Sequence, residues 1–200
     1  KMLGSLLLGV AIFMLLSAGV SAIYSEWLGV YSLVGAALIT IALGGALYYF
    51  SRSARQNFYA REAVAMVGLG WVAVSILGAL PYIFSGTITQ ISGAIFESAS
   101  GFTTTGSTVI TDVEICLNGI LFWRALTQWL GGMGIIVLFL AIFPHMGTGA
   151  KHMFKSEVPG PQSEGLTPKV RETAAILWRI YLGITAAEMV ALMLCGLGWF

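Results

Sequence analysis

Charged residues are scarce in this chain of 200 residues. Asp, Glu, Lys and Arg together make up 10% of it, whereas a soluble domain carries about 25%. Hydrophobic residues make up 58%. A composition this apolar predicts a membrane protein. The net charge of +1 is too small for a basic surface of the kind that binds nucleic acid, so we expect no nucleic-acid partner.

Cysteine and histidine are also scarce, with two of each. Cys116 and Cys195 lie far apart, in neither a CxxC nor a zinc-ligand pattern, so no disulfide framework or zinc site is expected. His145 and His152 are seven residues apart, a spacing that suits neither a metal site nor a proton relay. The sequence also lacks the HExxH motif and the GxxxxGK[ST] phosphate-binding loop.

Five apolar segments are each long enough to cross a bilayer, which takes roughly 20 apolar residues in a helix. They are Met2–Tyr24, Trp27–Phe50, Ala63–Phe84, Asn118–Phe143 and Ile176–Phe200. The first segment could be a signal peptide, but its apolar run is long and a second span follows almost at once. A hairpin of two helices is the better interpretation. The predicted fold class is therefore an all-α, polytopic membrane protein.

The positions of Lys and Arg predict the orientation. Positive charges precede the first span, separate the second from the third, and follow the fourth, at Lys1, Arg52, Arg55, Arg61, Lys151, Lys155, Lys169 and Arg171. The turn near Glu26 and the region 85–117 carry none. The positive-inside rule then places the N-terminus in the cytoplasm and the region 85–117 on the outer side.

The connection at residues 85–117 contains one apolar run, Ile91–Gly101. This run is too short to cross a bilayer and is typical of a re-entrant helix. Inside a membrane, unpaired backbone carbonyls are tolerated where protein buries them or where they line a watery cavity. The electronegative C-terminal end of such a helix would stabilise a cation in that cavity.

The run is followed by Thr103, Thr104, Thr105, Gly106 and Ser107. Extended threonines with a permissive glycine can aim successive carbonyls at one axis, and rings of carbonyls replace the hydration shell of K⁺. These residues predict a filter that binds K⁺ at Thr104 and Thr105. The alternative is a polar extracellular loop with threonine-rich turns. The position behind a half-length helix, between two spans, favours the filter.

Four motifs together carry a family resemblance. "FESASGFTTTGSTVI", "FWRALTQWLGGMGIIVLFLAIFP", "EVPGP" and "LTPKVRETAAILWRIY" are similar to the Trk/Ktr/HKT superfamily of potassium transporters, in particular to the bacterial Trk-type potassium-translocating subunit. In that family each unit consists of a helix, a re-entrant pore helix with its filter, and a second helix. Four units in one chain surround a single pore, and an extra pair of helices often precedes them.

The resemblance implies a division of the chain. Residues 1–50 would be the leading transmembrane pair, 61–143 the first pore unit, 144–171 a cytoplasmic loop, and 172–200 the truncated first helix of a second unit. The parts expected within the first unit are a helix at 63–84, a pore helix at about 91–101, the filter at 103–107 and a helix at 118–143.

The resemblance also implies partners and a location. It implies a homodimer in the bacterial inner membrane, a cytoplasmic ring of nucleotide-binding regulatory subunits, K⁺ as the bound ion and no organic cofactor. In this superfamily a glycine at the position of Gly106 accompanies a preference for potassium, and a serine there accompanies sodium permeation. The sequence leaves open whether transport is coupled to protons or sodium, as in a symporter.

A weak internal repeat supports a longer native chain. "REAVA" opens the third span at Arg61, and "RETAA" opens the fifth at Arg171. A second filter would then fall near residue 214, and four such repeats would total roughly 500 residues. One filter segment supplies a quarter of a ring, so either four copies assemble or the chain is the front part of a longer one. The resemblance implies the second case, a fragment of a four-repeat subunit. A homotetrameric channel and a non-conducting accessory or scaffold subunit are the alternatives.

Two further groups of residues are candidates for roles near the filter. Arg124 lies near the outer end of the fourth span, and intramembrane charges are functional suspects. It could pair with Glu97 and brace the filter from behind, or its side chain could snorkel to the interface. The glycines Gly131, Gly132 and Gly134 could allow close helix packing or form a flexible point in a pore-lining helix.

Catalysis is not expected. Ser100 could be imagined as the nucleophile of an intramembrane hydrolase, but a serine needs a base within hydrogen-bond reach. Both histidines are predicted to lie at the opposite membrane face. The favoured function is potassium permeation driven by the membrane potential, which supplies about 2.3 kcal/mol per charge at 100 mV.

Overall fold

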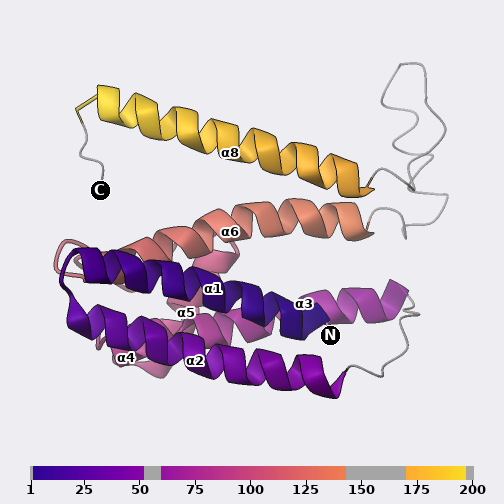
Figure 1. Cartoon of the computed structure of the whole chain (residues 1–200), viewed down its shortest axis with the longest axis horizontal. Coiled ribbons are helices and arrows are strands. Elements are labelled where there is room, and N and C mark those ends of the chain that lie inside the picture. Colours follow the sequence, from indigo (N-terminus) through magenta and orange to yellow (C-terminus); the bar gives the residue numbers. More distant parts are fainter. Residues whose placement is uncertain (1, 52–59, 143–169, 197–200) are drawn as a thin grey trace. The chain divides into compact units, whose positions relative to one another are not determined.

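The computed structural model describes residues 2–51, 60–142 and 170–196. All regular elements within these ranges are helices, so the all-α prediction is confirmed. Four segments in them are long and apolar enough to cross a membrane: Met2–Ile23, Trp27–Phe50, Ala65–Phe84 and Ala175–Leu194. Figure 1 shows the helices in chain order.

Several predictions from the sequence fall on residues outside the described ranges. These are His145, His152, most of the 144–171 loop and the positive charges at residues 1, 52, 55, 151, 155 and 169. The chain divides into two compact units, residues 1–132 and 133–200. The second unit contains α8 (Val170–Leu194). The first contains the leading hairpin and all of the predicted filter region.

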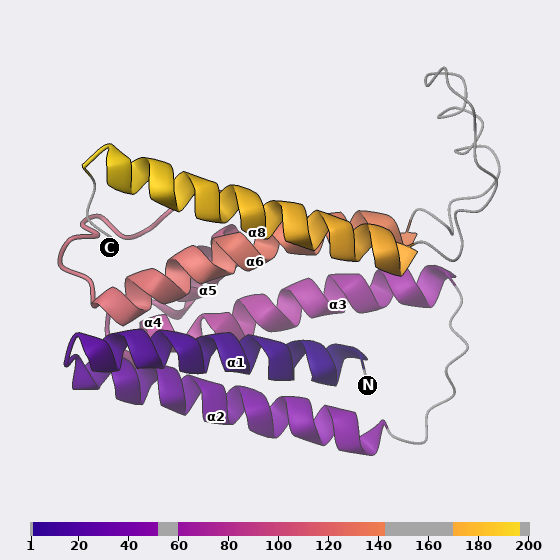
Figure 2. The ribbon, with the colours of Figure 1, turned by 45° about the horizontal axis from the view of Figure 1, so that its top comes forward.

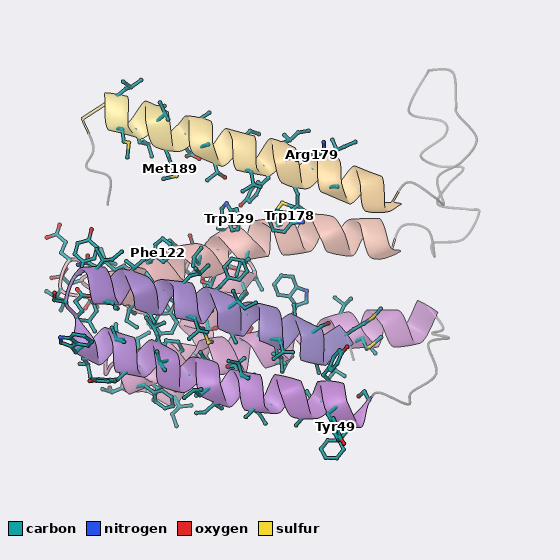
Figure 3. All side chains as sticks on the ribbon, in the orientation of Figure 1. Tyr49, Phe122, Trp129, Trp178, Arg179 and Met189 are labelled. Atoms are coloured by element: carbon teal, nitrogen blue, oxygen red, sulfur yellow. The ribbon has the colours of Figure 1, made fainter. Side chains whose placement is uncertain are left out.

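Helices α1 (Met2–Ile23) and α2 (Trp27–Phe50) form an antiparallel hairpin with a turn at residues 24–26. The contact face of α1 repeats every three or four residues, at Gly4, Leu7, Ala11, Met14, Ala18 and Ser21. This spacing places small and apolar side chains along one face, which is how membrane helices approach closely. Large apolar side chains cover the other faces; Figure 3 shows Tyr49 projecting away from the helices.

The third predicted span is interrupted. It consists of α3 (Ala60–Gly78) and α4 (Leu80–Phe84), because Pro81 has no N–H and disturbs the helical ladder. The amide of Tyr82 bonds to the carbonyl of Ala79 at 3.1 Å, which leaves the Gly78 carbonyl without its helical partner. The indole Nε1 of Trp123 donates to that carbonyl at 3.0 Å. An aromatic side chain from α6 (Asn118–Ile142) thus satisfies the backbone carbonyl that the kink leaves unpaired.

Helix α5 (Ile91–Phe102) has 12 residues and packs against α3. At 1.5 Å per residue it is about 18 Å long, too short to span a bilayer. Helix α6 follows and has 25 residues. Phe102 and Trp123 lock the two helices together as a buried edge-to-face pair with ring centroids 6.1 Å apart. This core positions the end of α5, where the candidate site begins.

Candidate functional site

Helix α5 ends in a tight C-terminal turn built from backbone hydrogen bonds. The amide of Thr104 bonds to the carbonyl of Gly101, and the amide of Thr105 bonds to that of Ser100, both at 2.9 Å. This pair of bonds is the Schellman motif that terminates many helices. The carbonyl of Ala99 accepts both the amide and the hydroxyl of Thr103. The last carbonyls of the helix are therefore occupied by the turn itself.

This turn corrects part of the expected backbone. The sequence predicts that Thr103 and Thr104 are extended, but Thr103 caps the helix with φ −85° and ψ 2°. Thr104 has φ 55°, the left-handed conformation that a Schellman motif requires at this position. A β-branched residue adopts it rarely, and such strain clusters at functional sites. Helix α5 also ends at Phe102, one residue beyond the expected end.

Gly106 also lies in the left-handed region, with φ 78°. No atom of the described residues lies within 4 Å of where a Cβ would be, so the requirement for glycine comes from the backbone angle and not from crowding. Residues 103–109 are exposed in the described structure. Gly106 is thus the second position in a span of three residues where the chain takes a left-handed conformation.

Hydroxyl groups hold the loop to the helix end. The Ser100 hydroxyl donates to the carbonyl of Ser107 at 2.6 Å, which ties the returning chain to α5. The hydroxyls of Thr103 and Thr105 are 2.8 Å apart, and that of Thr104 donates to the Thr103 carbonyl at 2.7 Å. Within the described residues, no hydrogen bond reaches the carbonyl oxygens of Thr104, Thr105 and Gly106. These three consecutive acceptors are available to a ligand.

The Glu97 carboxylate is the buried centre of the site. Its side chain is 1% exposed, and one turn of α5 separates it from Gly101. The hydroxyl of Thr108 donates to both carboxylate oxygens, at 3.0 and 2.9 Å, and the amide of Val109 donates at 2.9 Å. A buried carboxylate is stable only when it is paired and hydrogen-bonded, and these donors come from the chain just after the glycine.

Arg124 of α6 completes the environment of this carboxylate. Its Nε lies 2.7 Å from Oε1 of Glu97, in a hydrogen-bonded ion pair. The Arg124 side chain is 22% exposed, so most of its surface is covered by the protein. The contact that the sequence predicts between these residues is present. A role for the pair in supporting a filter stays a prediction.

The glycines of α6 differ in what surrounds them. Gly131 is buried, and a Cβ there would collide with the carbonyl of Phe102, at the end of α5. Gly132 and Gly134 are half-buried. Close packing therefore accounts for Gly131, and flexibility at the other two stays a prediction.

Two groups that hold the loop are not evident from the sequence. There, Ser100 stands out only as a possible nucleophile, and Thr108 does not stand out at all. A polar residue eleven positions after a glutamate has no periodic signal, because the loop between them must fold back before the two meet. The unusual density of hydroxyl residues is the available sign, since each short side chain can bond to a nearby backbone group.

These features define an all-helical membrane protein in which a half-length helix ends in a strained, carbonyl-presenting loop. The chain matches the family of cation transport proteins called TrkH over residues 32–196. The Trk system potassium uptake protein TrkH of Halomonas elongata is 37% identical over 203 residues, which cover 100% of this chain and 42% of that protein. TrkH of Escherichia coli K12 is 40% identical over 164 residues, covering 81% of this chain and 34% of that protein.

A solved structure is also similar. The crystal structure of the potassium transporter TrkH from Vibrio parahaemolyticus matches with a TM-score of 0.81 and 33% identity, covering 99% of this chain and 39% of that one. The chain belongs to the TrkH family of cation transport proteins, a family of multi-pass membrane transporters. It spans 34–42% of the length of these curated relatives.

Proposed function

We propose that this chain contributes one quarter of a potassium-selective permeation pathway, with the carbonyls of Thr104, Thr105 and Gly106 as ion ligands. Three neighbouring carbonyls that accept no hydrogen bond within the described residues carry the proposal. Carbonyl oxygens replace the hydration shell of K⁺ in filters, and K⁺ is the cargo here, not a resident cofactor. Thr103 and Ser107 flank these ligands and anchor them to α5.

The buried ion pair supports the proposal physically. A filter must hold its carbonyls in place while ions pass, so the loop needs rigid support on the side away from the ions. Glu97 supplies that support by binding Thr108 and Val109 directly, and Arg124 compensates its charge. The similarity to potassium uptake proteins supports K⁺ as the ion.

The rest of the pore must come from elsewhere. We propose that three further filter segments complete the ring, in the same native chain, and that the whole subunit forms a homodimer in the bacterial inner membrane with its N-terminus in the cytoplasm. A nucleotide-binding regulatory ring would bind on the cytoplasmic side. The relatives are named as members of a Trk system, which supports a multicomponent assembly. Energy comes from the membrane potential, with or without coupling to a second ion as in a symporter.

The test is ion flux through the full-length protein in proteoliposomes under an imposed membrane voltage. We expect flux of K⁺ well above that of Na⁺, and a rise in Na⁺ flux in the Gly106→Ser variant. Equal flux of the two ions in the parent protein would contradict a potassium filter. No flux of either ion would favour the alternative of a non-conducting accessory subunit.

A further inference from the structure

The start of α6 is capped by a residue from the leading hairpin. Leu117, which precedes the helix, has no side-chain oxygen and cannot cap it. The carboxylate of Glu26, in the turn between α1 and α2, instead accepts the amide of Asn118 at 3.0 Å and that of Gly119 at 3.3 Å. The side-chain amide of Asn118 also donates to it, at 3.0 Å.

This cap completes the hydrogen bonding of the first turn. A helix leaves its first four amides without helical partners. Glu26 takes the amides of Asn118 and Gly119, and the carbonyl of Leu117 takes that of Ile120 at 2.9 Å. The regular helical ladder then begins with the amide of Leu121, which bonds to the same carbonyl at 3.0 Å. A negative charge at a helix N-terminus is also favoured by the helix dipole. Glu26 thus holds α6 by hydrogen bonds and by charge, although it is 92 residues away in sequence.

A second contact joins the same two parts. Ser21 at the end of α1 is fully buried, and its hydroxyl has no hydrogen-bond partner in the described structure. A Cβ added to Gly119 would collide with that hydroxyl and would lie 2.9 Å from the carbonyl of Ser17. The first turn of α6 therefore lies directly against the backbone of α1. Figures 1 and 2 both show the start of α6 beside the turn of the hairpin.

The capped helix carries the residue that supports the candidate filter. Arg124 follows Asn118 by six residues, or about 9 Å along the helix axis. Its Nε lies 2.7 Å from Glu97, whose other oxygen holds the amide of Val109 at 2.9 Å. A continuous path of contacts therefore runs from the hairpin turn to the loop after Gly106.

We propose that Glu26 is a positioning residue for ion selectivity: by capping α6 it sets the position of Arg124 and, through Glu97, the shape of the filter loop. The leading hairpin would then act as an anchor for the filter in addition to being a lipid-facing pair of helices. This inference rests on the proposed potassium filter.

The experiment compares Glu26→Ala, Glu26→Gln and Glu26→Asp in the full-length protein, with Glu114→Gln as the matched control. Glu114 is an exposed acid in the loop before α6, so its change removes the same charge without touching the cap. Hydrogen exchange of the amides of Asn118 and Gly119 reports the cap, and the K⁺/Na⁺ flux ratio in proteoliposomes reports the filter. Membrane abundance is measured for each variant.

We expect faster exchange at both amides in Glu26→Ala, a smaller change in Glu26→Gln, and a flux ratio lowered roughly threefold, less than the roughly tenfold typical for a direct outer-shell partner. Glu26→Asp should recover part of the ratio, and Glu114→Gln should keep all of it. Combining Glu26→Gln with Arg124→Gln should lower the ratio no further than Arg124→Gln alone, because both act on one path.

Three results would overturn the proposal. Unchanged exchange in Glu26→Ala would show that the cap is not formed. Faster exchange with an unchanged flux ratio would show that the cap is structural only, and additive effects in the double variant would show that Glu26 acts by another path. If Glu26→Ala does not reach the membrane, the same comparison of amide exchange and flux ratio is made with Glu26→Gln and Glu26→Asp. A parent protein that does not prefer K⁺ contradicts the proposed function instead.

Discussion

Glu97 of α5 and Arg124 of α6 form an ion pair with 2.7 Å between Oε1 and Nε. The same carboxylate binds Thr108 and Val109, so a single buried group joins the short helix, the returning loop and the following helix. If either charge is removed, the other charged group remains covered by protein without the opposite charge that balances it.

Replacing Arg124 tests that arrangement. In Arg124→Gln, the Glu97 carboxylate, which is 1% exposed, keeps its two neutral donors, the Thr108 hydroxyl and the Val109 amide, but loses its positive partner. We therefore expect the free energy of unfolding to fall by about 1–3 kcal/mol. We also expect the K⁺/Na⁺ flux ratio to fall roughly tenfold, as for other outer-shell partners. Arg124→Lys keeps the charge and should lose less. Thermal unfolding in detergent and proteoliposome flux are the measurements, and an unchanged ratio in a stable Arg124→Gln protein would argue that the pair has no part in selectivity.

Gly106 provides a test that separates conformation from crowding. Since no described atom lies within 4 Å of where its Cβ would be, Gly106→Ala should cost only the roughly 1 kcal/mol of a left-handed residue with a side chain. The loop should relax away from φ 78°, and sodium flux should rise while membrane abundance stays near that of the parent. Gly68→Ala, at a position with no described atom within 4 Å and no positive φ, is the control. Parent-like selectivity in Gly106→Ala would contradict the role assigned to this angle.

Gly131 should be sensitive for the opposite reason. A methyl group there would meet the Phe102 carbonyl carbon at 2.8 Å, and the Gly101 carbonyl oxygen at 3.1 Å, so α6 must move away from α5. Overpacking of this kind typically costs about 1–3 kcal/mol. Gly131→Ala should lower the unfolding temperature, whereas Gly68→Ala, with no described atom within 4 Å, should leave it unchanged or raise it. Similar unfolding temperatures for the two variants would show that the helices accommodate the methyl group.

Cys116 reports on the loop before α6 through its pKa. Partial burial, and then the negative charge of Asp112, raise the pKa of this thiol above its usual range. Because the thiolate is the reactive form, modification by a membrane-impermeant methanethiosulfonate should be slow at pH 7 and should keep accelerating above about pH 8.5. Asp112→Asn should accelerate it at a fixed pH. The measurement uses a Cys195→Ser background and external reagent; labelling only from the cytoplasmic side would reverse the proposed orientation.

The helices were largely predictable, because length and apolar composition decide which segments can cross a bilayer. Trp27–Phe50 has the same bounds in the sequence prediction and in the structure. The break between Gly78 and Leu80 was not predicted, since Pro81 is tolerated in membrane helices whenever a neighbour takes over the freed backbone groups. That neighbour, Trp123, lies 45 residues away and gives no local signal.

The backbone of the candidate site was predictable only in part. The glycine at position 106 indicated an unusual conformation, and its φ is 78°. Thr104 carries no comparable sign, because a threonine is among the residues least expected at φ 55°. Its angle follows from the Schellman turn, in which the amides of Thr104 and Thr105 must reach back to the end of α5. Hydrogen bonds of this kind leave no sign in the hydrophobic periodicity of the sequence or in the secondary-structure propensities of its residues.

The kink at Pro81 makes two distant positions depend on each other. With any residue that restores a straight helix there, the amide of Tyr82 would return to the Gly78 carbonyl, and the buried indole of Trp123 would lose its acceptor. With a smaller residue at 123, the kinked carbonyl would be the one left unpaired. Across members of the family, positions 81 and 123 should therefore change together, as a proline–tryptophan unit that is inherited or lost as a whole.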